Sequence, residues 1–343
     1  MTFLIKFRRI VPLVLLGAAL FVTPADATFP GKNGRIAFLV GPDIYTMNPD
    51  GSDVRQLTHM SADRAVNWEF WSPDGKQIVF NEGPAAASGV GEIWLMNADG
   101  SNQHLVLVEE NFSDDRPSFT PDGNSILFNR CSRLAEECAI YRIGVDGSGL
   151  RALTKYELGI LDLSASASPD GQSLLFTGIS HDGIIAALFL KGSDGSALQR
   201  LTPVPLSPRQ PNWSPDGKTI AFSTHCCNPQ NQEIWTVRPD GSELRRLTNN
   251  GNDYFAGPHD FHPSWSPQGD AIVFERDAPD FSSSAIVVMR GDGTGLTKAI
   301  TLPRSRPDVD ARRSSVRLRA QGQIRVKQIE EGGALPRWGA ASD

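Results

Sequence analysis

The sequence predicts an all-β protein, a six-bladed β-propeller of four-stranded blades whose ring is closed by a C-terminal strand. Three observations predict this fold. A turn motif of the type Trp-Ser-Pro-Asp-Gly recurs along the chain, a short apolar strand ending in Phe follows each copy, and an Asp-Gly pair marks the second half of each unit. Each unit is about 48 residues long, and a repeat of that length is typical of propellers and solenoids.

The turn motif opens each unit. Complete or nearly complete copies begin at Trp71, Phe119, Ala167, Trp213 and Trp265, and a degenerate first copy is Phe29-Pro30-Gly31. The strands that follow end at Phe38, Phe80, Phe128, Phe176, Phe222 and Phe274. Proline presets φ for the second position of a type I turn, and the closing glycine accepts a left-handed conformation.

The Asp-Gly pair closes the second half of each unit. Its copies begin at Asp50, Asp99, Asp146, Asp194, Asp240 and Asp292, which are 46 to 52 residues apart. A strand such as 92–96 precedes the pair, and a shorter one, usually ending in Leu-Thr, follows it. Asp-Gly suits a two-residue hairpin, so each unit reads as four short strands. We expect each turn aspartate to accept hydrogen bonds from its own turn rather than to bind calcium.

Radial closure is favoured over a linear stack, because it hides the sheet edges that a stack would expose. The first unit lacks the strand that should precede its turn, and Leu335-Pro336-Arg337-Trp338-Gly339 is similar to the segment that begins at His262. We therefore predict a propeller over residues 28–301 and a basic tail over 302–343, with a strand near 335–339 that completes the first blade. The recurring tryptophans at Trp71, Trp213 and Trp265 are expected to pack between blades.

Residues 1–27 resemble a signal peptide. Lys6, Arg8 and Arg9 precede an apolar run of about 13 residues, too short for a membrane span, and Ala25-Asp26-Ala27 fits a cleavage site. We expect a mature protein that is exported to the periplasm or the exterior and does not span the membrane. Export permits disulfides. Cys131 and Cys138 are predicted to form a local bridge, while Cys226 and Cys227 could form a strained bridge or stay reduced.

The formal charge of −6 is unevenly spread, since both ends of the chain are basic and the body between them is acidic. An acidic body argues against nucleic acid as the principal partner. We expect a monomer without a cofactor.

The repeat resembles the WD-like (PD40) repeats of TolB-type propellers over about residues 29–301. The resemblance is carried by the Trp-Ser-Pro-Asp-Gly turn, the strand ending in Phe, and the second half that runs from Trp or Tyr through Asn-x-Asp-Gly-Ser to Leu-Thr. It implies a six-bladed propeller that is periplasmic and contacts a lipoprotein or another cell-envelope component. The sequence departs from that family by lacking its N-terminal α/β domain, which weakens the inference of a Tol role.

No catalytic motif stands out. A Gly-x-Ser-x-Gly elbow is absent, and the glycines occupy turn positions, so no phosphate or dinucleotide loop is formed. Function is therefore expected in the connections that enter the innermost strands, where the units differ. The candidate binding residues at this channel mouth are Trp68, Asp115, Arg116, Arg209, Gln210, Asp260 and His262.

Four of these candidates, Trp68, Arg116, Gln210 and His262, share one repeat position, three residues before the Trp column. They could line a binding mouth, or they could be solvated or locally bonded loop residues. His259, Asp260 and His262 with Asp253 could also be combined into a metal site, but their spacing on a loop is unspecific.

Two functions remain open. The sequence favours a non-catalytic exported propeller that binds a protein or cell-envelope component at the channel mouth. The alternative is an exported propeller hydrolase or lyase that acts on a sugar or lactone with a channel-bound metal ion.

Overall fold

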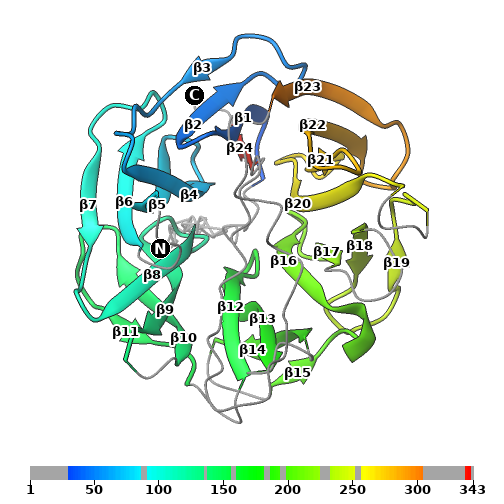
Figure 1. Cartoon of the computed structure of the whole chain (residues 1–343). Coiled ribbons are helices and arrows are strands. Elements are labelled where there is room, and N and C mark those ends of the chain that lie inside the picture. The colour runs from blue at the N-terminus through cyan, green and yellow to red at the C-terminus, as the bar shows by residue number, and fades with distance from the viewer. Residues whose placement is uncertain are drawn as a thin grey trace, which may run out of the picture.

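Six four-stranded antiparallel sheets are arranged around a common axis, as Figure 1 shows. The computed structural model describes residues 30–85, 91–134, 137–155, 160–180, 186–193, 198–224, 232–251, 256–303 and 337–340. The predicted signal peptide, Cys226 and Cys227, Asp253 and most of the basic tail lie outside these residues. In the part of the chain that the structure describes, no helix is long and apolar enough to cross a membrane.

The blades are numbered I to VI in chain order, and their strands run in sequence order from the axis outward in blades II to VI. Blade I holds β1 (Asn33–Val40), β2 (Asp43–Met47), β3 (Arg55–Gln56) and β24 (Arg337–Ala340). Blade II holds β4 (Arg64–Trp71), β5 (Gln77–Pro84), β6 (Glu92–Asn97) and β7 (His104–Leu107). Blade III holds β8 (Phe112–Phe119), β9 (Ser125–Ser132), β10 (Cys138–Gly144) and β11 (Arg151–Ala152).

Blade IV holds β12 (Ile160–Ala167), β13 (Ser173–Ser180), β14 (Ala186–Gly192) and β15 (Gln199–Arg200). Blade V holds β16 (Pro208–Trp213), β17 (Ile220–Thr224), β18 (Ile234–Val237) and β19 (Arg245–Arg246), and a short 3-10 helix, η1 (Val204–Leu206), precedes it. Blade VI holds β20 (His259–Trp265), β21 (Ala271–Asp277), β22 (Ser283–Arg290) and β23 (Thr297–Pro303).

The C-terminal strand closes the ring. β24 is the innermost strand of blade I and pairs antiparallel with β1, with Trp338 opposite Ile36 and Arg337 opposite Ala37. The prediction of ring closure by a C-terminal strand is therefore confirmed. Blades VI and I, which this strand helps to join, also share an apolar cluster that includes Phe38, Met47 and Val273.

The core lies between the blades. Each pair of neighbouring blades shares one hydrophobic cluster, so six clusters follow one another around the ring. The repeated phenylalanine lies within each second strand, which continues beyond it, and is buried in one of these clusters at 0–3% exposure. Trp71, Trp213 and Trp265 lie in three of these clusters, which confirms their expected packing between blades. Burial of such large side chains is the main stabilising contribution to the ring.

The turn aspartates bond within their own turns. In the Asp-Gly hairpin of blade I, Asp50 Oδ1 accepts hydrogen bonds from the backbone N–H and the hydroxyl of Ser52, at 2.9 and 2.6 Å. The same pair of bonds recurs in blades II, III, V and VI. In blade VI, Gln268 replaces the aspartate of the other turn, and Asp270 accepts the Ser266 hydroxyl instead.

The Leu-Thr ending has a structural purpose that its sequence pattern alone does not reveal. The threonine hydroxyl oxygen accepts the backbone N–H at the start of the third strand in blades I, III, IV and V, at 2.9–3.0 Å. These threonines are Thr58, Thr154, Thr202 and Thr248, all buried. Because a buried N–H needs an acceptor, the hydroxyl fixes the fourth strand of each blade to the third.

Candidate functional site

Five of the innermost strands contain a β-bulge. The register shifts between Asp115 and Ser118 in β8, and shifts at the same repeat position occur in β12, β16 and β20. In β4 the shift lies slightly earlier, between Val66 and Trp68. In four of these strands the bulged residue has a left-handed backbone, and these residues are Arg116 (φ 52°), Ser164 (φ 55°), Gln210 (φ 51°) and His262 (φ 53°). Such a conformation costs a non-glycine residue roughly 1–2 kcal/mol, so neighbouring groups must hold it in place.

Side-chain amides supply part of that support. Asn129 Oδ1, from blade III, accepts the backbone N–H of Ser164 in blade IV at 3.0 Å. Gln210 Oε1, from blade V, accepts the backbone N–H of His262 in blade VI at 3.4 Å. One blade thus stabilises the bulge of the next, and the side chain at each bulge is directed by its neighbour.

The bulge residues and Trp68 form a line of contacts, which we call the collar: Trp68, Arg116, Ser164, Gln210 and His262. Arg116 Nη1 donates to Ser164 Oγ at 2.7 Å, and its guanidinium lies 4.5 Å from the centroid of the Trp68 ring. Trp68 meets the His262 ring edge to face at 5.4 Å, and His262 Nε2 is 3.0 Å from Gln210 Nε2. The collar therefore links blades IV, III, II, VI and V.

The His262 imidazole is bonded at both nitrogens. Gln210 Oε1 accepts the Ser223 hydroxyl and the His262 N–H, which fixes Gln210 Nε2 as the donor to His262 Nε2. Nδ1 then carries the proton and donates to Glu275 Oε2 at 3.1 Å. The two side chains are buried, at 2% and 1% exposure. The imidazole is held in one tautomer and one orientation.

The structure brings four of the seven predicted site residues together in the collar and places Asp115 beside Arg116. Asp115 lies beside the collar, where its Oδ2 is 3.8 Å from Arg116 Nε and burial raises the pKa of its carboxyl. Asp260 is fully buried and receives two bonds from Arg276, at 2.7 and 2.8 Å. Arg209 Nη1 donates to the carbonyl of Pro208.

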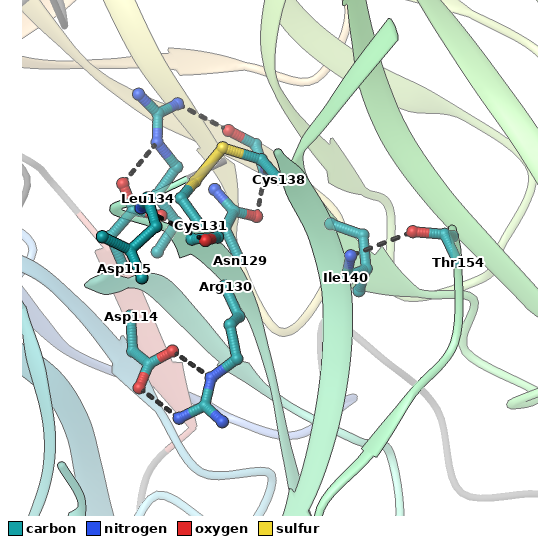
Figure 2. Close-up of a disulfide and its surroundings, with 12 residues drawn as sticks. Asp114, Asp115, Asn129, Arg130, Cys131, Leu134, Cys138, Ile140 and Thr154 are labelled. Carbon is teal, nitrogen blue, oxygen red and sulfur yellow. Dashed lines mark hydrogen bonds and ion pairs between the residues drawn. A yellow bond between two sulfur atoms is a disulfide. The ribbon is translucent and has the colours of Figure 1, made fainter. Parts of the chain in front are cut away.

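Blade III carries a second bidentate pair next to the collar. Arg130 donates to both oxygens of Asp114, at 2.7 and 2.8 Å, and both side chains are almost fully buried. Burial raises the pKa of Asp114, and the Arg130 guanidinium opposes that shift. On the adjacent turn of β9 and β10, a disulfide joins Cys131 to Cys138, which are opposite each other in the sheet (Figure 2).

Glu69 follows Trp68 on β4 and is more deeply buried. Its side chain is 1% exposed, and among the described residues neither carboxylate oxygen has a hydrogen-bond partner. Burial raises the pKa of Glu69 well above its ordinary value; the nearby Arg337 opposes the shift, and Glu275 adds to it. A carboxylate buried in this way is costly, so its presence requires an explanation.

Sequence reasoning missed two residues of this region. Ser164 occupies the same repeat position as Arg116, three residues before the Trp column, and extending the alignment through blade IV would have found it. Glu69 stands where three other units have proline, at Pro117, Pro211 and Pro263. The replacement of proline by glutamate was visible in the sequence, but the burial of the Glu69 side chain was not.

Three of the residues suggested for a metal site, His259, Asp260 and His262, are described by the structure, and each has other partners. Asp260 is bonded to Arg276 and His262 to Glu275, while the His259 ring stacks on Phe281 at 4.7 Å. Within the described ranges, no group of three or more His, Cys, Asp or Glu residues could hold a metal ion.

The fold and the collar define a class of protein, a six-bladed β-propeller whose innermost strands present a polar and aromatic cluster. The model of the TolB β-propeller domain (PD40) matches residues 40–202 and 116–303. The chain belongs to this family.

Solved structures agree on the fold. A protein assigned as TolB from Agrobacterium tumefaciens has a TM-score of 0.60 and 22% identity, with 80% of this chain and 90% of that chain covered. TolB from Acinetobacter baumannii has a TM-score of 0.64 and 22% identity, with 90% and 67% covered. An oligogalacturonate lyase in complex with manganese has a TM-score of 0.52 and 13% identity, with 80% and 75% covered.

One curated relative is similar over a shorter stretch. The uncharacterised protein Atu1656 of Agrobacterium fabrum is 31% identical over 111 residues, which is 32% of this chain and 35% of the relative. The matched stretch spans about a third of that relative's length.

Proposed function

We propose that the protein is a non-catalytic propeller that binds a protein or another cell-envelope component through the collar. In this proposal it is exported by the segment 1–27 and acts in the periplasm or outside the cell. Membership of the TolB propeller family supports the binding role, and a lipoprotein partner follows from the resemblance to TolB.

The observation that carries the proposal is the collar itself. Four non-glycine residues with left-handed backbones occur at one repeat position, and strain of this kind clusters at functional sites. Their side chains contact one another across blades instead of pointing separately into solvent. Trp68 and Arg116 are only half-buried, and both residue types are common in the centres of protein interfaces.

The chemistry of His262 favours binding over catalysis. A general base needs a free nitrogen within reach of the proton that it abstracts. Nε2 of His262 is engaged by Gln210 and Nδ1 by Glu275, and both bonds are buried. The imidazole thus positions Trp68 and is not poised to take a proton from a substrate.

A capture experiment tests the proposal. Immobilised wild-type protein is incubated with cell-envelope extract, and the retained proteins are identified by mass spectrometry. Arg116→Ala removes the guanidinium that stacks on Trp68 and should lose the retained partner. Arg238→Ala is the matched control, because Arg238 is exposed and pairs with Glu243 on a hairpin turn of blade V. Equal retention by wild type and Arg116→Ala would refute a role for the collar.

The enzymatic alternative is tested separately. A lyase or hydrolase with a channel-bound metal ion would retain stoichiometric metal after dialysis, measured by elemental analysis of the purified protein. We expect no such retention, because the candidate ligands Asp260 and His262 are already bonded to Arg276 and Glu275. Stoichiometric metal would favour the enzyme.

A further inference from the structure

Glu69 is the strongest unexplained feature of the molecule. Glu69 follows Trp68 of the collar on β4, its side chain is buried, and no hydrogen-bond donor of the described residues reaches its carboxylate. Leaving such a group unsatisfied costs about 1–3 kcal/mol, and an apolar side chain would avoid the cost. Retaining a destabilising group is common where function requires it.

Residues near Glu69 connect it with the collar. Trp68 precedes it on β4 and touches His262, and His262 is bonded to Glu275. Glu275 is close enough to disfavour a charge on Glu69, and Arg337 of β24 is close enough to favour one. Strands from blades I, II and VI therefore meet at one small polar region.

The charges of this region indicate which kind of group could bind there. With Glu69 ionised, two carboxylates, Glu69 and Glu275, face the one guanidinium of Arg337, which also lies 5.8 Å from the centroid of the Phe70 ring. Glu275 already has the His262 N–H as a donor. An anion would meet two carboxylates, whereas a cationic group would balance the charge and give Glu69 the donors that it lacks.

The adjacent aromatic ring supports the same choice. Indole rings attract ammonium and guanidinium groups through their electron-rich faces. The Trp68 ring already takes part in such a contact with Arg116. Trp68 and Glu69 are successive residues of β4, so one short segment carries two groups that attract a basic side chain.

We propose that Glu69 is the receptor for a cationic group, a lysine or arginine side chain of the bound protein partner, which enters beside Trp68. This inference rests on the proposed function and names the chemistry of the partner. Entry displaces the edge contact between Trp68 and His262. Because burial raises the pKa of Glu69 and a bound cation favours its ionised form, we expect binding to be accompanied by proton release.

Small probes test the proposal on the full-length protein. Nα-acetyl-arginine amide and Nα-acetyl-lysine amide carry the two side chains, and Nα-acetyl-glutamine amide and Nα-acetyl-aspartate amide are the neutral and anionic controls. Calorimetry at pH 6 in two buffers of different ionisation enthalpy measures affinity and proton release together. We expect saturable binding of a cationic probe with release of up to one proton, and weaker or no binding of the controls.

Two variants identify the receptor. Glu69→Gln should lower the affinity for the cationic probe by at least about tenfold and abolish proton release. Its melting temperature is measured to check that the variant is folded. Glu243→Gln, a change of an exposed carboxylate in blade V, should bind like wild type. Absence of saturable binding to wild type, equal binding by Glu69→Gln, binding without proton release, or preference for the aspartate probe would each overturn the inference.

The outcomes separate this inference from the proposed function. If capture from the envelope extract depends on Arg116 but no cationic probe binds, the collar still binds a partner and Glu69 is not its receptor. If a cationic probe binds at Glu69 but Arg116→Ala retains the same partners as wild type, Glu69 remains the receptor and the proposed role of the collar is refuted.

Discussion

Trp68 meets His262 edge to face, with 5.4 Å between their ring centroids, although blade I lies between the blades that carry them. His262 lies in the bulge of β20 and is outside the ladder of its own sheet, whereas Trp68 pairs with Asn81 directly after the bulge of β4. Because His262 is in turn bonded to Glu275 and Gln210, the Trp68 ring is coupled to both neighbours of the imidazole.

Replacement of Glu69 by glutamine is expected to stabilise the protein at neutral pH. The raised pKa of Glu69 means that the folded state binds a proton more tightly than the unfolded state. The free energy of unfolding therefore falls as the pH rises from 4.5, the ordinary pKa of glutamate, toward the raised pKa of Glu69 in the folded state. Glutamine is neutral at every pH, so Glu69→Gln should gain about 1–3 kcal/mol at pH 8 and little at pH 4. Urea unfolding at both values measures this, and a variant no more stable than wild type at pH 8 would contradict the assignment.

The Leu-Thr threonines are expected to be structural. Thr154→Val keeps the shape of the side chain but removes the oxygen that accepts the Ile140 N–H at 2.9 Å, a bond drawn in Figure 2. The unsatisfied buried donor should cost about 1–3 kcal/mol of unfolding free energy. Thr297→Val, an exposed threonine of β23, is the control and should change stability by less than about 0.5 kcal/mol. Equal effects of the two substitutions would remove this explanation of the motif.

Loss of the disulfide should destabilise blade III without unfolding the ring. The bridge between Cys131 and Cys138 closes a short loop, with a sequence separation of 7. Chain-entropy estimates for so small a loop give about 2–3 kcal/mol. Thermal unfolding of the double variant Cys131→Ser/Cys138→Ser measures the loss. Because β9 also carries Arg130 and Asn129, which support Asp114 and Ser164, the variant is expected to weaken partner capture as well. An unchanged melting temperature would argue that the bridge has no stabilising role.

Removal of the last strand should open the ring. A chain ending at residue 336 lacks β24, so the inner edge of β1 loses its partner strand. An exposed strand edge is a site for pairing with other chains. We expect a lower melting temperature and concentration-dependent association, measured by calorimetry and light scattering. A truncated chain that stays monomeric and melts like the full chain would show that closure by β24 is dispensable.

Much of the fold was predictable because it is local. The Asp50 hairpin and the Ser72 turn are specified by a few adjacent residues, whose side chains bond to their own backbone. The Phe80 column repeats at one position of the unit, so its burial between blades could be read from the period. The pairing of the last strand with β1 was predictable because the unit near Trp338 supplied what the first unit lacked.

The candidate site was only partly predictable. Alignment of the units placed Trp68, Arg116, Gln210 and His262 at one level of the ring, and the structure joins them in one line of contacts. Asp260 has a similar sequence position but forms a pair with Arg276 instead. Nothing in the residue types separates the two cases, since both depend on the direction of a side chain at a bulge.

The sequence by itself determined the number of blades, the turns, the columns of core residues and the strand that closes the ring, because repeat period and turn chemistry are properties of neighbouring residues. Tertiary structure alone decided that Trp68 meets His262 and that Glu69 lies near Arg337 and Glu275. These groups are far apart along the chain, and only the closure of the ring and the bulges of its inner strands bring them together. Their burial there, which no local pattern specifies, sets the charge of Glu69 and with it the chemistry that we propose for the site.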